Sequence, residues 1–159
     1  MRLSTLVLSA ALFSLGACTT AAPPASSVRQ IVSTTSFGMC VGYCSTRLEI
    51  SESQAVLTRS SRGGRGGRGG AQLPDQRFTA PLTASEWQEI ERLAGNASLE
   101  GLPPTIGCPD CADGGAESLT IAGAGEPKTV SFEYGATIPQ AQPLLERVRA
   151  LRTRLTPAS

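Results

Sequence analysis

The sequence predicts an α+β domain in which an antiparallel sheet, built from two hairpins, carries two amphipathic helices on one face. Segments 46–59 and 118–134 each contain two β-prone runs joined by a turn. Each of these segments is followed by a stretch with helical periodicity, at 84–94 and at 143–155. This ββα-ββα order, which shows no residue-level repeat, fits a single domain over residues 29–159.

The first half of the domain contains several β-prone segments. Residues 29–36 are expected to form a first strand. Residues 46–50 alternate between apolar and polar side chains, residues 51–53 supply a turn, and residues 54–59 return as the second strand of a hairpin. Residues 76–80 are expected to form a further short strand.

A three-fold Arg-Gly-Gly repeat occupies residues 62–70. Glycine at this density does not hold regular structure, so the repeat predicts a flexible loop. An arginine-rich arm would suit anionic partners such as lipopolysaccharide, acidic glycans or nucleic acid. The lack of interleaved aromatic residues for base stacking, and the small cost of lengthening a loop, favour a tolerated insertion instead.

The helix after this region has a well-marked start. Thr83 is the expected N-cap, and Glu86 closes a capping box. Leu82 and Trp87 have the spacing of a hydrophobic staple. One face of the helix is apolar: Trp87, Ile90, Leu93 and Ala94. The dipeptide at 95–96, Gly-Asn, predicts a left-handed C-terminal cap.

The second hairpin pairs residues 118–121 with residues 129–134 across the glycine-rich turn 123–127. The last helix begins near Pro143 and has an apolar face: Leu144, Val148, Leu151 and Leu155. Its later turns carry arginines that suit the negative end of the helix dipole: Arg147, Arg149, Arg152 and Arg154. We expect these arginines to form a solvated helix surface, and contact with phospholipid headgroups is the alternative.

The N-terminal residues predict export and lipid anchoring. Arg2 precedes an apolar run at residues 3–13 that is shorter than the about 20 residues needed to cross a bilayer, as is typical of a secretory signal. Residues 15–18, Leu-Gly-Ala-Cys, resemble the lipobox of bacterial lipoproteins. The resemblance implies that residues 1–17 are a signal peptide removed before Cys18, and that Cys18 carries the lipid.

Residues 18–28 are then the lipidated cysteine and a flexible, proline-containing tether. Three acyl chains exceed the two signals that stable anchoring requires. Thr19 stands where an aspartate tends to retain lipoproteins in the inner membrane of diderm bacteria. We therefore expect attachment to the outer membrane of the cell envelope, with the domain facing the periplasm.

Composition narrows the classes of function. The chain has no histidine, which excludes Ser-His-Asp and Cys-His catalysis and histidine-ligated metals. Its 14 basic and 13 acidic residues give a net charge of +1, and removal of Arg2 with the signal leaves the chain near neutral. Nucleic acid is therefore not an expected partner. No cofactor and no metal are expected.

Two segments couple closely spaced cysteines to glycines: residues 37–44 and residues 106–117. Together with residues 132–135, they resemble a family of uncharacterised bacterial lipoproteins and envelope domains. The shared pattern is a Gly-x-Cys-x3-Cys opening followed by an amphipathic strand. The resemblance covers most of the chain after Ser33, with the Arg-Gly-Gly loop as a local insertion. It implies an envelope domain and supplies no catalytic residues.

The cysteines after Cys18 are expected to form disulfides, because the predicted compartment is oxidising. We favour the two local pairs: Cys40–Cys44 and Cys108–Cys111. In a straight strand the Cα atoms of the first pair would be about 13 Å apart, beyond disulfide reach, so Gly38 and Gly42 would have to supply a bend. Cross-pairing between the segments stays open, since a longer closed loop restricts the unfolded chain more.

Other chemistries compete for the same residues. Cys108 and Cys111 have the spacing of redox dithiols, although no clear helix follows and Asp110 disfavours a thiolate. The number of cysteines matches a tetrathiolate zinc site, but their spacing does not. Calcium could bind Asp110, Asp113 and Glu117, which lack the EF-hand pattern.

The sequence favours a non-enzymatic, membrane-anchored envelope lipoprotein that binds or scaffolds an envelope protein or glycan. A periplasmic thiol–disulfide protein that uses Cys108 and Cys111 is the alternative. A third hypothesis is an inhibitor that inserts the Arg-Gly-Gly loop or the Cys108–Cys111 turn into an enzyme cleft.

Overall fold

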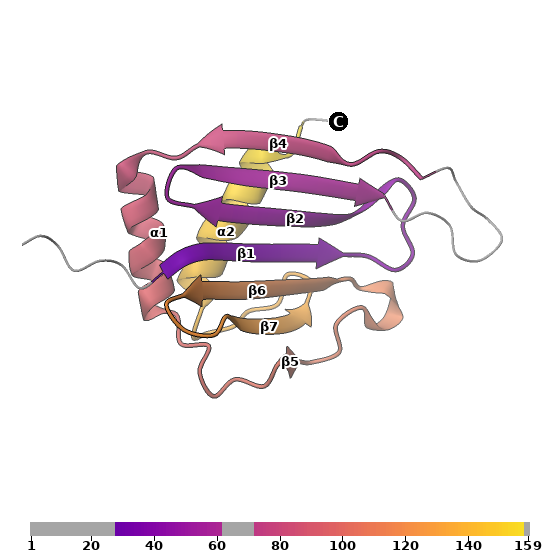
Figure 1. The fold of residues 1–159 in the computed structure, drawn as a ribbon. Coiled ribbons are helices and arrows are strands. Elements are labelled where there is room, and N and C mark those ends of the chain that lie inside the picture. Colours follow the sequence, from indigo (N-terminus) through magenta and orange to yellow (C-terminus); the bar gives the residue numbers. More distant parts are fainter. Residues whose placement is uncertain (1–27, 62–71, 158–159) are drawn as a thin grey trace, which may run out of the picture.

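The computed structural model describes residues 28–61 and 72–157, which form one sheet and two α-helices (Figure 1). The strands are β1 (Val28–Ser36), β2 (Tyr43–Ser51), β3 (Gln54–Ser61), β4 (Gln76–Pro81), β5 (Thr105–Ile106), β6 (Ala116–Gly123) and β7 (Lys128–Glu133). The helices are α1 (Ala84–Asn96) and α2 (Gln142–Leu155), and a short 3-10 turn spans Cys111–Asp113. The predicted signal peptide, Cys18, the tether up to Ser27 and the Arg-Gly-Gly repeat lie outside the described residues. No helix in the described ranges is long and apolar enough to cross a membrane.

The strand β1 lies inside a seven-stranded sheet whose order is β4-β3-β2-β1-β6-β7-β5. It pairs antiparallel with β2 on one side and with β6 on the other, so that Ser33 faces Leu48 and Leu119 across the two ladders. All other neighbours are antiparallel as well, except that β5 runs parallel to β7. The prediction of an α+β fold with a mostly antiparallel sheet and two helices is confirmed.

The predicted ββα-ββα arrangement of two hairpins is matched only in part: four strands precede α1, and three lie between α1 and α2. The hairpins β2–β3 and β6–β7 both form, but β1 joins them into one sheet by pairing with each. The strand β4 extends this sheet beyond β3, and β5 adds two residues beside β7. Periodicity within a segment does not report which distant strand it pairs with, so this pairing could not be predicted from each segment alone.

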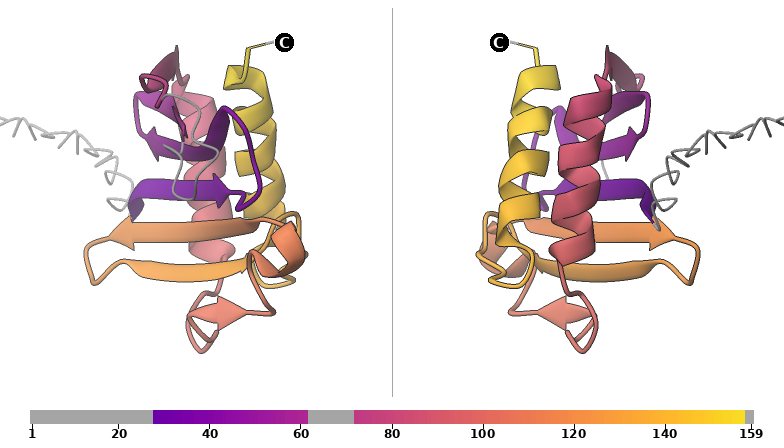
Figure 2. Two further views of the ribbon diagram at one scale, coloured as in Figure 1. Left: turned by 90° about the vertical axis from the view of Figure 1, so that its right-hand side faces the viewer. Right: turned by 90° about the vertical axis from the view of Figure 1, so that its left-hand side faces the viewer.

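Both helices lie on the same face of the sheet and cover the core (Figures 1 and 2). In Figure 1, α2 crosses behind the sheet and α1 runs along the end at which β1 begins. Alternate strand residues point towards the helices and are buried: Ile31, Leu48, Ile50, Leu57, Leu119, Val130 and Phe132. The opposite face carries hydrogen-bonded hydroxyl pairs: Thr34 with Ser118 (2.7 Å) and Thr120 with Thr129 (2.8 Å). The sheet therefore has one apolar, covered face and one polar face.

The helix α1 begins with the predicted capping box. The hydroxyl of Thr83 accepts a hydrogen bond from the backbone N–H of Glu86 (3.2 Å), and Oε2 of Glu86 accepts one from the N–H of Thr83 (3.0 Å). Leu82 and Trp87, which have the spacing of a hydrophobic staple, are both buried in the core. The start of the helix is thus fixed by local sequence.

The end of α1 differs from the prediction. Gly95 and Asn96 belong to the helix and have no positive φ, so the predicted left-handed cap is wrong. The helix closes at Ala97, whose backbone is extended and whose N–H bonds the carbonyl oxygens of Leu93 and Ala94. These two bonds satisfy terminal carbonyls without a left-handed residue.

Three of the four arginines of α2 lie mostly against other elements, and the fourth, Arg154, is exposed. All four have carboxylate partners: Arg147 and Arg154 with Glu86, and Arg149 and Arg152 with Glu117. The prediction of a solvated arginine face therefore holds only for Arg154 and is wrong for the other three. These three arginines are covered because acidic side chains of α1 and β6 face this helix, and the sequence of the helix alone does not reveal these partners.

Glu86 is held by contacts from both helices. The backbone bond from Thr83 is the largest cause that lowers the pKa of Glu86 from 4.5 to about 2, and the bond from Arg154 (2.9 Å) is the next. Because this pKa is depressed in the folded protein, the contribution of ionised Glu86 to stability is complete above pH 4.5 and is lost as the pH falls towards 2.

The Glu86→Gln variant carries no titrating group at this position. We therefore expect its stability to fall less than that of the parent protein between pH 4.5 and pH 2. Urea denaturation midpoints measured for both proteins across this range, at one ionic strength, test the prediction. Parallel profiles for the two proteins would contradict it.

Candidate functional site

Two cysteine-containing loops meet at one end of the sheet, which we call the disulfide end. The first cysteine loop, residues 37–44, joins β1 to β2, and the second cysteine loop, residues 107–115, leads into β6. Ser36 faces Ser45 on β2 and Ala116 on β6, so both loops leave the sheet at this same end (Figure 1).

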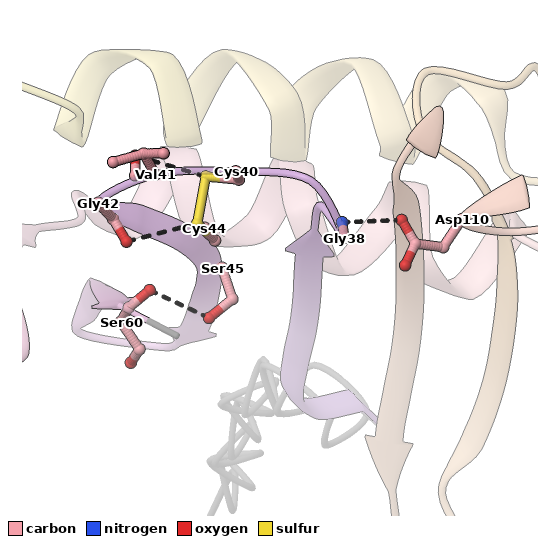
Figure 3. Close-up of a disulfide and its surroundings, with 8 residues drawn as sticks. All are labelled: Gly38, Cys40, Val41, Gly42, Cys44, Ser45, Ser60 and Asp110. Atoms are coloured by element: carbon pink, nitrogen blue, oxygen red, sulfur yellow. Dashed lines mark hydrogen bonds between the residues drawn. A yellow bond between two sulfur atoms is a disulfide. The ribbon is translucent and has the colours of Figure 1, made fainter. Parts of the chain in front are cut away.

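Within each loop the cysteines are joined to each other. Cys40 pairs with Cys44, and Cys108 pairs with Cys111, with a Cα–Cα distance of 5.5 Å in both pairs (Figure 3 shows the first). The left-handed backbone of Gly42, with φ +88°, supplies the bend that the first pair needs. The structure thus contains local pairs and not pairs between the loops. Cys44 is buried, whereas Cys40, Cys108 and Cys111 are exposed.

The two loops are in close contact. The N–H of Gly38 donates to Oδ1 of Asp110 (3.1 Å), and a Cβ on Gly38 would lie 3.1 Å from Oδ2 of the same carboxylate (Figure 3). Phe37 covers Gly115, where a Cβ would lie only 2.5 Å from the ring. The same ring meets Tyr134 edge-on, with 4.8 Å between centroids. Glycine at both contact points therefore allows the loops to approach each other.

The second cysteine loop has a strained backbone. Asp110, Ala112 and Asp113 have positive φ values of 64°, 51° and 60°. This region costs a residue with a Cβ about 1–2 kcal/mol. The loop is fixed to β7 by a hydrogen bond from the N–H of Cys108 to Oε1 of Glu133 (3.0 Å). Such strain persists only where surrounding contacts impose it, and it is common at functional sites.

Exposed apolar side chains gather at the disulfide end. In the described ranges, four large apolar residues are exposed: Met39 (80%), Val41 (100%), Tyr134 (50%) and Leu73 (39%). Met39 and Val41 belong to the first cysteine loop, and Tyr134 packs against its Phe37. The N–H of Leu73 bonds the hydroxyl of Ser61 (2.7 Å), which ends β3 at the same end of the sheet. Exposed apolar groups that lie close together mark interaction sites, and here Met39 and Val41 share one loop.

The residues considered for calcium do not come together. Asp110 and Asp113 lie beside Gly38, whereas Glu117 is 1% exposed and is bound by arginines. No group of three or more Cys, Asp or Glu residues in the described parts of the chain is arranged to hold a metal. The separation of Glu117 from the two aspartates contradicts the calcium hypothesis.

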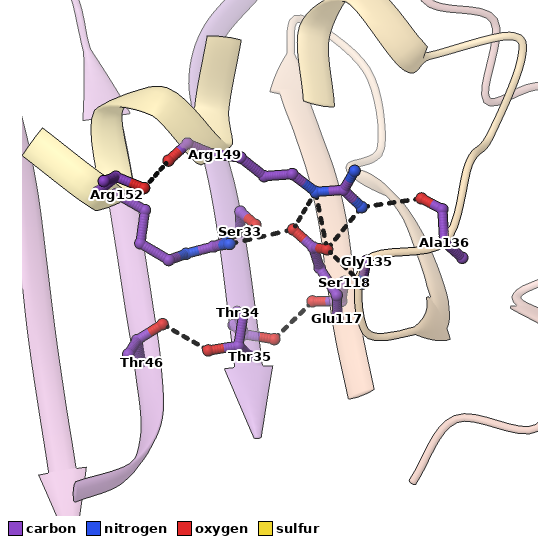
Figure 4. Close-up of polar contacts among 11 residues, drawn as sticks. Ser33, Thr34, Thr35, Thr46, Glu117, Ser118, Gly135, Ala136, Arg149 and Arg152 are labelled. Carbon is purple, nitrogen blue, oxygen red and sulfur yellow. Dashed lines mark hydrogen bonds and ion pairs between the residues drawn. The ribbon is translucent and has the colours of Figure 1, made fainter. Parts of the chain in front are cut away.

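A buried charged cluster lies between β6 and α2 (Figure 4). The carboxylate of Glu117 accepts hydrogen bonds from Arg149 (2.7 Å) and Arg152 (3.1 Å). Arg149 also donates to the carbonyl oxygen of Ala136 (2.8 Å), and Arg152 also donates to the hydroxyl of buried Ser33. Two guanidinium groups against one carboxylate leave this cluster with a net charge of +1.

The sequence contains a signal for this cluster. Alternation along β6 places Glu117 on the same face as Leu119 and Ile121, which is the face that the helices cover. Arg152 follows Val148 by one helical turn and so falls on the buried stripe of α2. Each charge considered alone belongs in solvent, and burial becomes favourable only when the opposite charge is placed beside it.

Two small cavities share Tyr134 in their walls. The first measures about 160 Å³ and is lined by Tyr134, Gly135, Arg149, Arg152 and Thr153. The second measures about 280 Å³ and is lined by Cys108, Cys111, Gly114, Gly115, Glu133 and Tyr134. The first cavity brings two cationic side chains within reach of a ligand, and the second borders the Cys108–Cys111 disulfide.

No protein-family model matches the sequence, and no match was found among curated proteins. The resemblance of the cysteine segments to bacterial envelope lipoproteins therefore stays a prediction.

Proposed function

We propose that the protein is a non-enzymatic, lipid-anchored envelope lipoprotein that binds another envelope protein through its disulfide end. The observation that supports this proposal best is the exposure of Met39 and Val41 on a loop closed by the Cys40–Cys44 disulfide. A loop held in this way loses little conformational freedom on association. Its aliphatic side chains suit an apolar pocket on a protein better than a glycan.

The direction of β1 supports the same proposal. This strand begins at Val28, directly after the predicted tether, and ends at Ser36, where the first cysteine loop starts (Figure 1). Nine residues of strand span about 30 Å. The disulfide end is thus the end of the sheet farther from Val28, where the predicted tether joins the domain.

Photocrosslinking in intact cells tests the proposed surface. We expect a photoreactive amino acid at Val41 to capture one reproducible envelope protein, and Met39→Ser in the same chain to reduce that capture about tenfold, as the loss of an interface anchor does. The matched control is the same photoreactive residue at Ala124, in the turn after β6 at the opposite end of the sheet. This position should not capture the same protein.

The anchor is tested in the same cells. Cys18→Ser should abolish incorporation of labelled fatty acid and release the protein from the membrane fraction. Equal capture from Val41 and Ala124, capture of glycan alone, or membrane attachment of the Cys18→Ser protein would each contradict the corresponding part of the proposal.

A thiol–disulfide protein is the second candidate. Its support is the exposure of Cys108 and Cys111 beside a cavity of about 280 Å³. Against it, only a single 3-10 turn follows Cys108, so in the described parts of the chain no α-helix begins beside this sulfur to activate it. The reduction potential separates the candidates, because a value below about −300 mV marks a structural bond and one between about −120 and −270 mV an oxidoreductase.

A further inference from the structure

Arg149 and Arg152 line the cavity of about 160 Å³, for which we infer a role that goes beyond the proposed function and does not depend on it. Both side chains are ion-paired to Glu117, which lies beneath them and is not part of the cavity wall (Figure 4). The side chains of Arg149 and Arg152 are 25% and 10% exposed, respectively. Their positive charge therefore meets a site that is only partly open to water, where charge–charge attraction is stronger than in bulk solvent.

These guanidinium groups have more donors than the protein has acceptors for them. Each arginine carries five N–H donors. Arg149 uses Nε and Nη2 for Glu117 and Ala136, and no acceptor in the described parts of the chain binds its Nη1. Arg152 uses Nη1 and Nη2 for Glu117 and Ser33, while its buried Nε has no acceptor among the described residues. The Nε of Arg152 is buried and cannot reach a ligand, whereas the Nη1 of Arg149 is accessible and belongs to a residue that lines the cavity, so an added acceptor can bind there.

We propose that this cavity binds a carboxylate group. One more negative charge would neutralise the +1 cluster, and a planar carboxylate matches the fork of N–H donors that a guanidinium presents. The volume of about 160 Å³ admits a carboxylate with a small substituent. Gly135 contributes no side chain to obstruct the wall, and the ring of Tyr134 gives the substituent an apolar surface.

Two sources share this chemistry. The ligand is either a free small organic acid or the C-terminal carboxylate of a peptide. A peptide could extend past Tyr134 towards the second cavity beside Cys108 and Cys111, because both cavities include this tyrosine in their walls. The carboxylate contacts are the same in both cases.

Nuclear magnetic resonance titration of the isotope-labelled full-length chain tests the proposal. The probes are acetate, N-acetyl-alanyl-alanine and the C-terminal amide of the same peptide. We expect acetate and the peptide acid to produce saturable shifts in the backbone amides of Gly135 and Thr153, and the peptide amide to produce none. A peptide acid that binds at least about tenfold more tightly than acetate identifies a peptide end, and equal or weaker binding identifies a free small acid.

Two variants and one control locate the site. Arg149→Gln should weaken binding about tenfold or more, because it removes charged donors from the cavity. Thr153→Leu should do the same by filling the cavity while both arginines and Glu117 remain in place. Ala150→Leu lies on the same helix, is exposed and does not line the cavity, so it should leave the affinity unchanged.

The proposal is overturned by any of three results. The first is the absence of saturable shifts with both carboxylate probes. The second is equal binding of the peptide amide or of sulfate, which would show that the carboxylate is not what is recognised. The third is a Thr153→Leu protein that binds as the parent does, which would place the ligand elsewhere. None of these results bears on membrane attachment or on the crosslink at Val41.

Discussion

Replacing Glu117 by glutamine is expected to lower the free energy of unfolding by about 3–5 kcal/mol. The reason is charge: without the carboxylate, the buried guanidinium of Arg152 and the guanidinium of Arg149, which is 25% exposed, have no opposite charge beside them. Keeping an unpaired charge away from water costs free energy. Urea denaturation of the parent and of Glu117→Gln at neutral pH measures the difference.

Two comparisons separate this effect from the loss of an ordinary ion pair. Glu49→Gln breaks the pair between Glu49 and Arg47, which are 29% and 52% exposed, and should cost about 0–1 kcal/mol. The double variant Glu117→Gln/Arg152→Met removes a buried cation together with the carboxylate, so it should be more stable than Glu117→Gln alone. A double variant that is less stable than the single one would show that lost packing, and not unpaired charge, dominates.

Gly115→Ala is expected to cost about 2–4 kcal/mol, combining the left-handed backbone with overpacking. Gly115 has φ +83°, and a Cβ there would lie 2.5 Å from the ring of Phe37 and 3.2 Å from the carbonyl oxygen of Ser36. The ring also meets Tyr134 edge-on, so moving it aside would break that contact. Because Phe37 opens the first cysteine loop, the variant should also loosen the contact between the two loops. Urea denaturation reports the stability, and the crosslink at Val41 reports the loop.

Two other glycines divide this cost into its parts. Gly135 has φ +77°, and a Cβ there would meet no atom within 4 Å, so Gly135→Ala should show the backbone cost alone, about 1–2 kcal/mol. Gly125 has neither a left-handed φ nor a close neighbour, and Gly125→Ala should change stability by less than about 0.5 kcal/mol. If Gly115→Ala proved no more harmful than Gly135→Ala, the contact with Phe37 would not be tight.

The elements that the sequence predicts well are those with local signals. Alternation places the hairpins β2–β3 and β6–β7, and Thr83 with Glu86 marks the start of α1. Two features could not be predicted from local signals. The strand β5 has only two residues, too few for a period, and the pairing of β1 with both β2 and β6 depends on a partner far along the chain. Gly95 and Asn96 show that a cap signal can be overruled when the last turn satisfies its own carbonyls.

The candidate site was predictable only in part. The short spacing of the cysteines favours the local pairs that the structure contains, because Gly42 provides the necessary bend. The exposure of Met39 and Val41 follows from their place in a loop beyond the end of the sheet, and apolar residue type alone would have placed both in the core. The pairing of Glu117 with two arginines joins residues more than thirty positions apart, which makes it a property of the tertiary fold.

The central position of β1 has a mechanical consequence. Any pull on the N-terminus enters the domain at Val28 and runs along a strand that is hydrogen-bonded on both edges. A load directed along β1 shears the two ladders together, so that many bonds resist at the same moment. The same load directed along the outer strand β4 would meet the bonds of a single ladder. Tension that reaches this domain along its N-terminus is therefore borne by a strand that is paired on both edges.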